Sequence, residues 1–519
     1  MNRWWGRAAA LALGAPLALA FPRPGWWWLA LVGLVPTLLL ARAAPDAREA
    51  VVRAWLAGTG FFLAVNAFLA PKVGPFMVPL AMLLAALWLP LGWLAWHLLG
   101  RRRLAAALVL LPSVFVAGEA VRSWEGLGGP WGLLGASQWN APPLLGVAAL
   151  GGVWAVSLLL VAVNVAVAAA LARGVPSRSR VTAAAVAVAL PLLALAWWAW
   201  RPPPPAGTTV RVGLVQPGIV GPVEARFQAS ERLSRELAAA APDLVVWGES
   251  SVGRDPAANP GDMARLAAAA RAAGGPVLAN VDAERGGGGG IYKSALLVGP
   301  EGPVGSYDKL RLVPFGEYVP LRPLLGWVTG FTDAAEVDRH RGSRLTVLPA
   351  GRFDVGPLVC FESAFPDLAR NLAAAGADVV VVQTADTTFQ GTWGLDQHAS
   401  LSAVRAVEAG RPVVQAAVSG VSAAFDARGR RLAWRPGSWR GATVVEVPLS
   451  AERTPYARAG DWVPVACALV LAGGTLAALR RRFSRGGSGR PAGSTARSTP
   501  APPPPPAAAP RRTAGRQGS

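Results

Sequence analysis

The chain has 519 residues, of which 53% are hydrophobic and 15% are charged, and its mean hydropathy is +0.37. This composition is too apolar for an ordinary soluble protein, so membrane-spanning segments are expected. The formal net charge is +20, but much of it lies in short loops between apolar runs and in the C-terminal tail. Such charge sets orientation in a membrane and attracts anionic lipid. We expect no nucleic-acid partner, because no base-reading module accompanies the charge; binding by the tail alone stays open.

Eight apolar runs approach the roughly 20 residues that a membrane-spanning helix needs. They lie at 7–21, 25–41, 53–70, 75–99, 104–121, 144–172, 181–200 and 462–479. Gaps rich in arginine alternate with poor ones: three arginines follow residue 41, whereas Lys72 stands alone in the next gap. By the positive-inside rule, the N-terminus and the tail are cytoplasmic and 201–461 lies outside. The first run also resembles a cleavable signal peptide, but cleavage would leave 201–461 on the same side.

The part after the seventh run has the pattern of a layered α/β domain, because β-rich runs alternate with helical patterns. Strands are expected at 210–216, 243–248, 276–281, 293–298, 353–361, 377–383, 412–418 and 442–448, and helices at 224–241, 261–273, 364–375 and 397–409. We therefore predict a polytopic α-helical membrane domain of about eight spans with an extracytoplasmic α/β domain. Its parts are a seven-helix membrane domain at 1–200, a proline-rich linker at 201–207, a catalytic domain at 208–450, a C-terminal transmembrane helix at 462–479 and a disordered basic cytoplasmic tail at 480–519.

The gap at 122–143 is long and contains three tryptophans, Trp124, Trp131 and Trp139. One interpretation is an interfacial tryptophan belt. The other is a loop that leans on the outer domain. Glu119, near the outer end of the fifth run, is expected either to snorkel or to pair, with Arg122 as one candidate partner, and a structural role is favoured.

Three expected strand ends or loops carry groups that suit covalent catalysis. Cys360 closes an apolar run, and Cys467 lies in a membrane run, so Cys360 has no expected disulfide partner and serves either packing or chemistry. Glu249 closes L-V-V-W-G-E, and Lys309 lies eight residues before Glu317. Together these groups supply what acyl transfer through a thioester needs.

A thiol is mostly protonated near pH 7, so it needs a base to accept its proton. Glu249 can be that base if partial burial raises its pKa. The ammonium of Lys309 and a backbone N–H can hold the oxyanion of the tetrahedral intermediate. No histidine is expected beside the cysteine: His97 is in a membrane run, His340 is in a charged loop and His398 is at a polar helix start.

The order Glu–Lys–Cys on successive strands resembles the nitrilase, or carbon–nitrogen hydrolase, superfamily, which has an α-β-β-α sandwich fold. With membrane spans before and after this domain, the chain resembles the apolipoprotein N-acyltransferase family over roughly residues 1–480. The matching segments are P-W-G-L-L-G-A-S-Q at 130–138, Y-D-K-L-R-L-V-P-F-G-E-Y-V-P at 307–320, C-F-E at 360–362, Q-H-A at 397–399, R-A-V-E-A-G-R-P at 405–412 and S-G-V-S-A at 419–423.

The resemblance implies a multi-pass enzyme of the bacterial cytoplasmic (inner) membrane that works by a ping-pong mechanism. An acyl chain passes from a membrane phospholipid to Cys360, and then to the α-amino group of the N-terminal diacylglyceryl-cysteine of an apolipoprotein. Glu249 is the implied base and Lys309 the oxyanion partner, and no metal or cofactor is implied. The implied supporting residues are Glu317, Glu362 and Phe361, and a lipid lid of Trp327 and Phe331 is one interpretation, with ordinary core aromatics as the other.

The chain also departs from the family pattern. Gly248 replaces the proline usual before the catalytic glutamate, and Phe227 stands where a tryptophan is expected. Two other functions stay open. The first is a membrane-anchored amidase of the same superfamily, which would act on a small amide with water as acceptor. The second is a membrane protein without enzymatic activity, such as a transporter, although Glu119 is the only acid that sits within the apolar runs as such a function would require.

Overall fold

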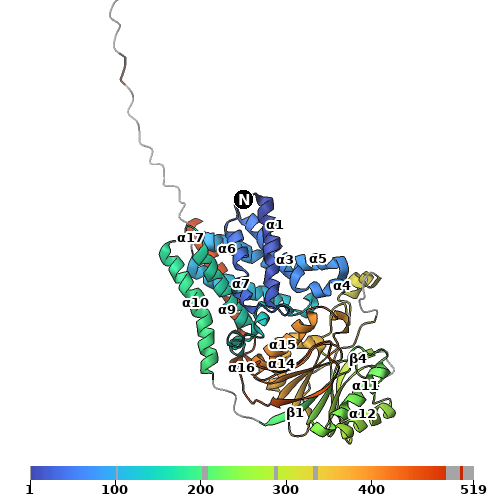
Figure 1. Ribbon diagram of the computed structural model, residues 1–519. Helices are drawn as coiled ribbons and strands as arrows, with labels where there is room; N and C mark the ends of the chain where they lie inside the picture. The colour runs from blue at the N-terminus through green and yellow to red at the C-terminus, as the bar shows by residue number, and fades with distance from the viewer. Residues whose placement is uncertain are drawn as a thin grey trace, which may run out of the picture. The chain divides into compact units, whose positions relative to one another are not determined.

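The computed structural model describes residues 2–100, 103–201, 208–285, 290–330, 337–486 and 503–505 (Figure 1). The chain divides into two compact units, Met1–Ala472 and Gly473–Ser519. The helices and strands described below belong to the first unit, except for the last helix, Trp462–Gly486, which begins in the first unit and ends in the second. Phe331 lies outside the described residues.

The N-terminal part of the first unit is helical. Its longer helices are α1 (Arg3–Gly14), α2 (Val35–Arg42), α3 (Ala47–Val65), α5 (Met77–Ala85), α6 (Leu89–Gly100), α7 (Leu104–Arg122), α9 (Ala148–Leu171) and α10 (Ser177–Trp200). Shorter helices connect them: η1 (Ala15–Ala20), η2 (Trp27–Leu31), η3 (Ala67–Leu69), α4 (Ala70–Val73), η4 (Gly74–Phe76), η5 (Ala86–Trp88), η6 (Glu125–Leu127), η7 (Leu134–Gln138) and α8 (Pro142–Leu145). After the α/β part follow α16 (Pro455–Ala459) and α17 (Trp462–Gly486).

Within the described residues, five helices are long and apolar enough to cross a membrane. They are 67–100, 104–122, 148–171, 177–200 and 462–480. The other three expected runs form shorter or more polar helices. A 3-10 helix with Pro16 in its first turn follows α1, and α3 carries a buried Glu49–Arg53 ion pair of 3.1 Å in its first half. The count of about eight spans therefore stays a prediction.

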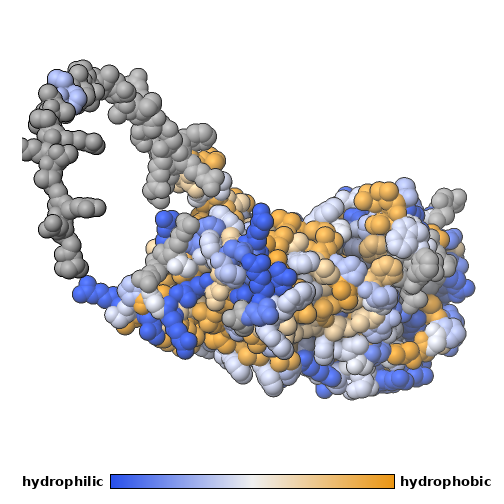
Figure 2. Space-filling view, turned by 90° about the horizontal axis from the view of Figure 1, so that it is seen from above, coloured by the Kyte–Doolittle hydropathy of each residue, from blue (hydrophilic) through white to orange (hydrophobic). Residues whose placement is uncertain are grey.

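Hydrophobic side chains are widely exposed on these helices, as the space-filling view also shows (Figure 2). On α10 the exposed residues include Val181, Val188, Leu192 and Leu193, and on α17 they include Val465 and Leu469. Large apolar areas open to solvent are unusual for a soluble protein and mark a surface that contacts lipid or another protein.

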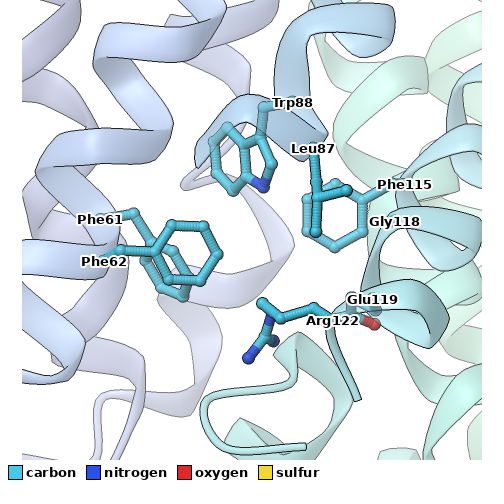
Figure 3. Close-up of a pocket in the computed structure, with 8 residues that line it drawn as sticks. All are labelled: Phe61, Phe62, Leu87, Trp88, Phe115, Gly118, Glu119 and Arg122. Atoms are coloured by element: carbon cyan, nitrogen blue, oxygen red, sulfur yellow. The ribbon is translucent and has the colours of Figure 1, made fainter. Parts of the chain in front are cut away.

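Glu119 has the structural role expected of it. Its Oε1 accepts a hydrogen bond of 2.6 Å from the backbone N–H of Leu134. The guanidinium of Arg122 donates to the carbonyl of Trp131 and lies over the Phe62 ring, 5.1 Å from the centroid. Figure 3 shows this guanidinium turned into a pocket whose other walls include Phe61 and Trp88. Both residues thus hold the loop that leads toward the α/β part.

The α/β part contains two six-stranded sheets among the described residues. One has the order β12-β1-β2-β3-β4-β5 and the other β11-β10-β9-β8-β7-β6. The strands are β1 (Thr209–Gln216), β2 (Leu244–Trp247), β3 (Val277–Arg285), β4 (Gly290–Gly299), β5 (Gly302–Asp308), β6 (Leu348–Pro349), β7 (Asp354–Val359), β8 (Val379–Thr384), β9 (Val413–Ala417), β10 (Ser422–Phe425), β11 (Arg431–Arg435) and β12 (Gly441–Pro448).

The two sheets pack face to face with helices on both outer sides. Valines and leucines of β1, β2, β7 and β8 form the core between the sheets. Helices α11 (Val223–Glu236) and α12 (Pro260–Ala273) cover the first sheet, and α14 (Pro366–Ala374) and α15 (Gly394–Ala409) cover the second. This arrangement is the expected α-β-β-α sandwich. In Figure 1, α14 and α15 lie between the second sheet and the helical part.

All eight expected strands and all four expected helices of this part are present. Four strands were not expected, namely β5, β6, β10 and β11. Their sequences are short or polar, and β11 is largely exposed, so no apolar run marked them. Three of them, β5, β6 and β11, are edge strands, whereas β10 is buried between β9 and β11.

The loop at 122–143 leans on the α/β part, as one of the two interpretations predicted. The indole N–H of Trp131 donates to Gln397 of α15 at 2.9 Å, and Trp139 stacks on Trp434 at 5.3 Å. Only Trp124 of the three tryptophans is exposed. A second contact is formed where α9 is kinked, because the backbone N–H of Val153 donates to Glu408 of α15 at 2.6 Å.

Candidate active site

Cys360 stands at the turn where β7 ends and η11 (Cys360–Ala364) begins. Its φ is +52°, a left-handed conformation that non-glycine residues seldom adopt and that often occurs at functional sites. The thiol is partly exposed and has no disulfide partner. The fold therefore presents one reactive side chain at the carboxyl end of a buried parallel strand.

Glu249 follows β2 directly and faces the cysteine from the other sheet. Its carboxylate lies close enough to the thiol of Cys360 for each group to shift the pKa of the other, and its Oε2 accepts from the backbone N–H of Ala385 at 3.1 Å. A buried glutamine, Gln383, ties the two sheets together at this point by donating to the carbonyls of Trp247 and Leu278 at 2.9 and 3.0 Å. The strand ends that carry Glu249 and Cys360 are thus linked through Gln383 of β8, which pairs with Val359 in the sheet.

Lys309 and Glu317 complete the expected group. Lys309 Nζ is fully buried and lies 2.8 Å from Glu317 Oε1 and 3.6 Å from Glu249 Oε1. The second oxygen of Glu317 accepts from the backbone N–H of Val313 at 2.9 Å. Burial works against the charge of Lys309, but the two carboxylates outweigh it and raise its pKa. The lysine therefore stays an ammonium close to the reacting thiol, where an oxyanion would form.

Glu362, one of the implied supporting residues, has other partners than Lys309, whose ion pairs among the described residues are with Glu249 and Glu317. Its side chain accepts hydrogen bonds from the hydroxyl of Tyr307 and the backbone N–H of Leu310, both at 2.7 Å, and from the N–H of Val359 at 2.8 Å. These donors lie on either side of Lys309 and just before Cys360. The fully buried carboxylate therefore fixes two catalytic segments to each other through their backbones.

A second lysine enters the site, and the sequence did not reveal it. Lys293 Nζ on β4 lies 3.1 Å from Glu249 Oε1, closer than Lys309 does. Burial raises the pKa of the Glu249 carboxyl, but the ammonium groups of Lys293 and Lys309 outweigh burial and lower it to about 2. The expectation that the pKa of Glu249 is raised overall is therefore wrong. Glu249 is ionised and ready to accept a proton across the physiological pH range.

The thiol has the opposite tendency. Burial raises the pKa of Cys360 well above its usual range, the charge of Glu249 adds to this effect and Lys309 opposes it. The cysteine is therefore protonated at neutral pH, so it can attack only when a neighbouring group accepts its proton. Glu249 is the carboxylate that acts most strongly on the pKa of this thiol.

His398 lies beside the nucleophile, contrary to the expectation from the sequence. Its Nδ1 lies 2.8 Å from Asp386 Oδ1 and its Nε2 lies 3.1 Å from the carbonyl oxygen of Cys360. Burial lowers the pKa of His398, but Asp386 outweighs it and the result is raised. An imidazolium that donates from both nitrogens fits these two acceptors. The start of α15, which the sequence marked only as polar, therefore places this ring beside the left-handed turn at Cys360.

The same three residues are the one group among the described residues whose donor atoms could hold a metal ion. A sulfur, a carboxylate oxygen and a ring nitrogen of Cys360, Asp386 and His398 lie within 4.8 Å of one another. The ring and the carboxylate, however, already bind each other directly.

Two of the remaining candidates contact the helical part of the chain. Phe361 turns away from the thiol and packs edge-to-face on Phe365 at 5.0 Å, against Gly129. Trp327 lies in η10 (Gly326–Gly330), is 56% exposed and packs edge-to-face on Phe76 of η4 at 6.1 Å. Trp327 is therefore not a core aromatic. Phe227, on α11, is one: it is buried against Trp247.

Gly248 is the basis of a first prediction. A Cβ at this position would lie 2.2 Å from the backbone nitrogen of Val418, so Gly248→Ala must push the end of β2 away from the end of β9. We expect the free energy of unfolding to fall by roughly 1–3 kcal/mol and acylation of Cys360 to slow, because Glu249 moves with the strand. Thermal unfolding and thioester formation measure the two effects.

Gly261→Ala is the matched control. A Cβ at Gly261 meets nothing within 4 Å, and the residue lies in α12. This substitution should leave activity unchanged and stability equal or slightly higher. Equal behaviour of the two variants would contradict the close approach at Gly248.

This sandwich and its carboxylate, lysine and cysteine define a carbon–nitrogen hydrolase domain. The "Carbon-nitrogen hydrolase" family matches residues 211–456, and the "Apolipoprotein N-acyltransferase N-terminal domain" family matches residues 13–166. Among solved structures, a carbon-nitrogen hydrolase from Helicobacter pylori G27 is 16% identical with a TM-score of 0.37, covering 48% of this chain and 92% of its own.

Full-length relatives narrow this class to one family. The apolipoprotein N-acyltransferase of Azotobacter vinelandii is 33% identical, with 94% of this chain and 97% of that protein covered. Those of Geobacter metallireducens and Pseudomonas putida are each 32% identical, covering 89% and 91% of this chain and 94% and 97% of those proteins. The chain belongs to the apolipoprotein N-acyltransferase family.

Proposed function

We propose that the protein transfers an acyl chain from a membrane phospholipid to the N-terminal diacylglyceryl-cysteine of apolipoproteins. The observation that carries this proposal is the meeting of Glu249, Lys309 and Cys360 in one buried site of a chain with long apolar helices. An enzyme whose two substrates are both lipids needs such helices for more than anchoring.

In the first half-reaction the sulfur of Cys360 attacks the carbonyl carbon of a phospholipid ester. Glu249 accepts the thiol proton, and the ammonium of Lys309 stabilises the oxyanion that forms. When the intermediate collapses, the carbon–oxygen ester bond breaks and the leaving alkoxide takes the proton from Glu249. The products are a lysophospholipid and an acyl thioester on Cys360.

In the second half-reaction the neutral α-amino group of the acceptor attacks the thioester carbonyl. Glu249 accepts a proton from the nitrogen, the carbon–sulfur bond breaks and the thiolate recovers that proton. An amide forms and the thiol is restored. Glu317 keeps Lys309 charged and aimed throughout, because it is the nearer of the two carboxylates.

Trp327 forms a lid at the membrane surface in this proposal. The support is that Trp327 is exposed and contacts Phe76, which lies within the apolar segment 67–100. An aromatic ring with one wet and one apolar face suits a membrane interface.

We place the catalytic part of the chain on the outer side of the bacterial cytoplasmic membrane, because arginine-rich and arginine-poor gaps alternate. A reporter enzyme fused at residue 208, after the first seven runs, should be active only outside the cytoplasm. Activity of that reporter in the cytoplasm would contradict the orientation.

A reconstituted assay tests the function. The purified protein in phosphatidylethanolamine vesicles should convert a diacylglyceryl-cysteine peptide to a product heavier by one acyl chain, with one lysophospholipid released for each. The amidase alternative predicts ammonia release from a small amide and no change in the mass of the peptide.

A further inference from the structure

Lys293 is a buried lysine that the mechanism above does not use. It lies on β4 directly opposite Asp282 of β3 in the antiparallel register, and it is 9% exposed. Its Nζ lies 3.1 Å from Glu249, 3.2 Å from Asp282 and 3.9 Å from Glu317. It also donates to the hydroxyl of Ser250 at 3.0 Å. Lysine is almost never buried unless its charge is paired with acidic groups. Here the three carboxylates provide that pairing.

The distances divide the two lysines between the two glutamates. Lys309 is nearer to Glu317, at 2.8 Å, than to Glu249, at 3.6 Å. The nearest described cation of Glu249 is therefore Lys293. If one ammonium had to serve both buried carboxylates, the more distant carboxylate would bind a proton, since an unpaired buried charge is costly. A protonated Glu249 cannot accept the proton of Cys360.

We propose that Lys293 is a positioning residue of the acyl-transfer site, whose ammonium keeps Glu249 ionised and aimed at Cys360 while Lys309 serves Glu317 and the oxyanion. This inference rests on the proposed function, in which Glu249 is the base. In this arrangement Lys293 supplies one ammonium group for Glu249 and Lys309 supplies another for Glu317.

Other charged groups near this cluster do not replace Lys293. Arg339 lies 3.7 Å from Asp282, and Arg226 acts on Asp282 and Glu249 from a distance while it donates to the carbonyl of Ser250 at 2.6 Å. His398 acts on Glu249 electrostatically from the other side of the site, but is bonded to Asp386. Removal of Lys293 thus removes the closest cation of Glu249 and leaves Lys309 shared between two glutamates.

The direction of the pH effect follows from these contacts. Burial raises the pKa of Glu249, and Lys293 is the largest of the influences that lower it. Without Lys293, burial counts for more and the pKa rises, by roughly one to three units for the loss of a charge at this distance. Glu249 is then protonated at acid pH, so acylation of Cys360 falls there and recovers as the pH increases.

The test is the pH profile of Cys360 acylation by phosphatidylethanolamine in a single turnover, with the full chain in vesicles. In Lys293→Met we expect the acidic limb of the profile to shift to higher pH by one unit or more relative to the unaltered protein. Lys293→Arg should restore the original profile even if its rate is lower. Arg339→Met, which removes a cation near Asp282 and leaves Lys293 in contact with Glu249, should not shift the profile.

Two outcomes would overturn the inference: a Lys293→Met profile that superimposes on the original one, or a loss by the same factor at every pH. If Lys293→Met does not fold, the double variant Lys293→Met with Asp282→Asn removes a balanced pair of charges. The acidic limb of its pH profile should show the same shift to higher pH. Absence of the thioester in the unaltered protein would instead contradict the proposed function itself.

Discussion

Cys360→Ala should abolish acyl transfer while the protein remains folded. The sulfur is both the nucleophile of the first half-reaction and the leaving group of the second, so no other side chain can replace it. We expect a loss on the order of 10⁴-fold or more. Cys360→Ser should fail as well, because a hydroxyl is a weaker nucleophile and an alkoxide a poorer leaving group. Product formation from a diacylglyceryl-cysteine peptide measures the loss, and thermal unfolding checks the fold.

Cys467→Ala is the control for this prediction. Cys467 is the other cysteine of the chain and is 4% exposed on α17, among apolar side chains. Its replacement removes a small buried volume, which costs roughly 1 kcal/mol of stability, and should leave the rate of transfer nearly unchanged. Substantial turnover by Cys360→Ala would exclude covalent catalysis through Cys360.

Glu249→Gln should slow the formation of the thioester by roughly a hundredfold or more. Glutamine keeps the shape of the side chain but cannot accept a proton. Glu317→Gln should retain part of this step, because Glu317 holds Lys309 at 2.8 Å and the backbone of Val313, whereas Glu249 is the carboxylate that acts most strongly on the thiol. The main effects of Glu317→Gln should be weaker stabilisation of the oxyanion and slower turnover.

Single-turnover labelling of Cys360 in the two variants separates these roles. Slow labelling in Glu249→Gln with residual labelling in Glu317→Gln supports the assignment. Fast labelling in Glu249→Gln with none in Glu317→Gln would reverse it and make Glu317 the base.

The fold could be predicted from the sequence wherever a buried strand is a continuous run of large apolar residues. Strand β10, with the sequence S-A-A-F, is buried but lacks such a run. The runs ending at Glu249 and Cys360 are continuous apolar segments between turn residues, and both are core strands in the structure. The edge strands escaped prediction because their side chains face solvent and carry no such signal: β11 begins with Arg431 and is mostly exposed. The long helices could be recognised for a similar reason, since α9 and α10 are apolar almost throughout.

The candidate site could be predicted only in part. The groups at strand ends, Glu249 and Cys360, and Lys309 in its motif, were found from their position after apolar runs. Lys293 and His398 were not, because their relation to the site depends on tertiary packing. Lys293 begins an apolar run and resembles a solvated strand end, whereas the β3–β4 register points it inward beside Asp282. His398 reaches Cys360 only because α15 packs across the end of β7.

The missed lysine also explains why one expectation about electrostatics was wrong. Burial alone would have raised the pKa of Glu249, and the sequence offered one cation to oppose it. The structure provides two, and together they outweigh the cost of burial. The sign of a pKa shift at a buried site depends on partners from other strands, which spacing along the chain does not reveal.

The central claim is that an acyl chain rests on Cys360 between the two lipid substrates. The most direct test is to incubate the protein with phosphatidylethanolamine alone and to measure the mass of the peptide that carries Cys360. The account predicts a mass increase of one acyl chain on Cys360, removed by hydroxylamine and discharged when a diacylglyceryl-cysteine peptide is added. An unmodified Cys360 in a preparation that still acylates the peptide when both lipids are present would contradict it.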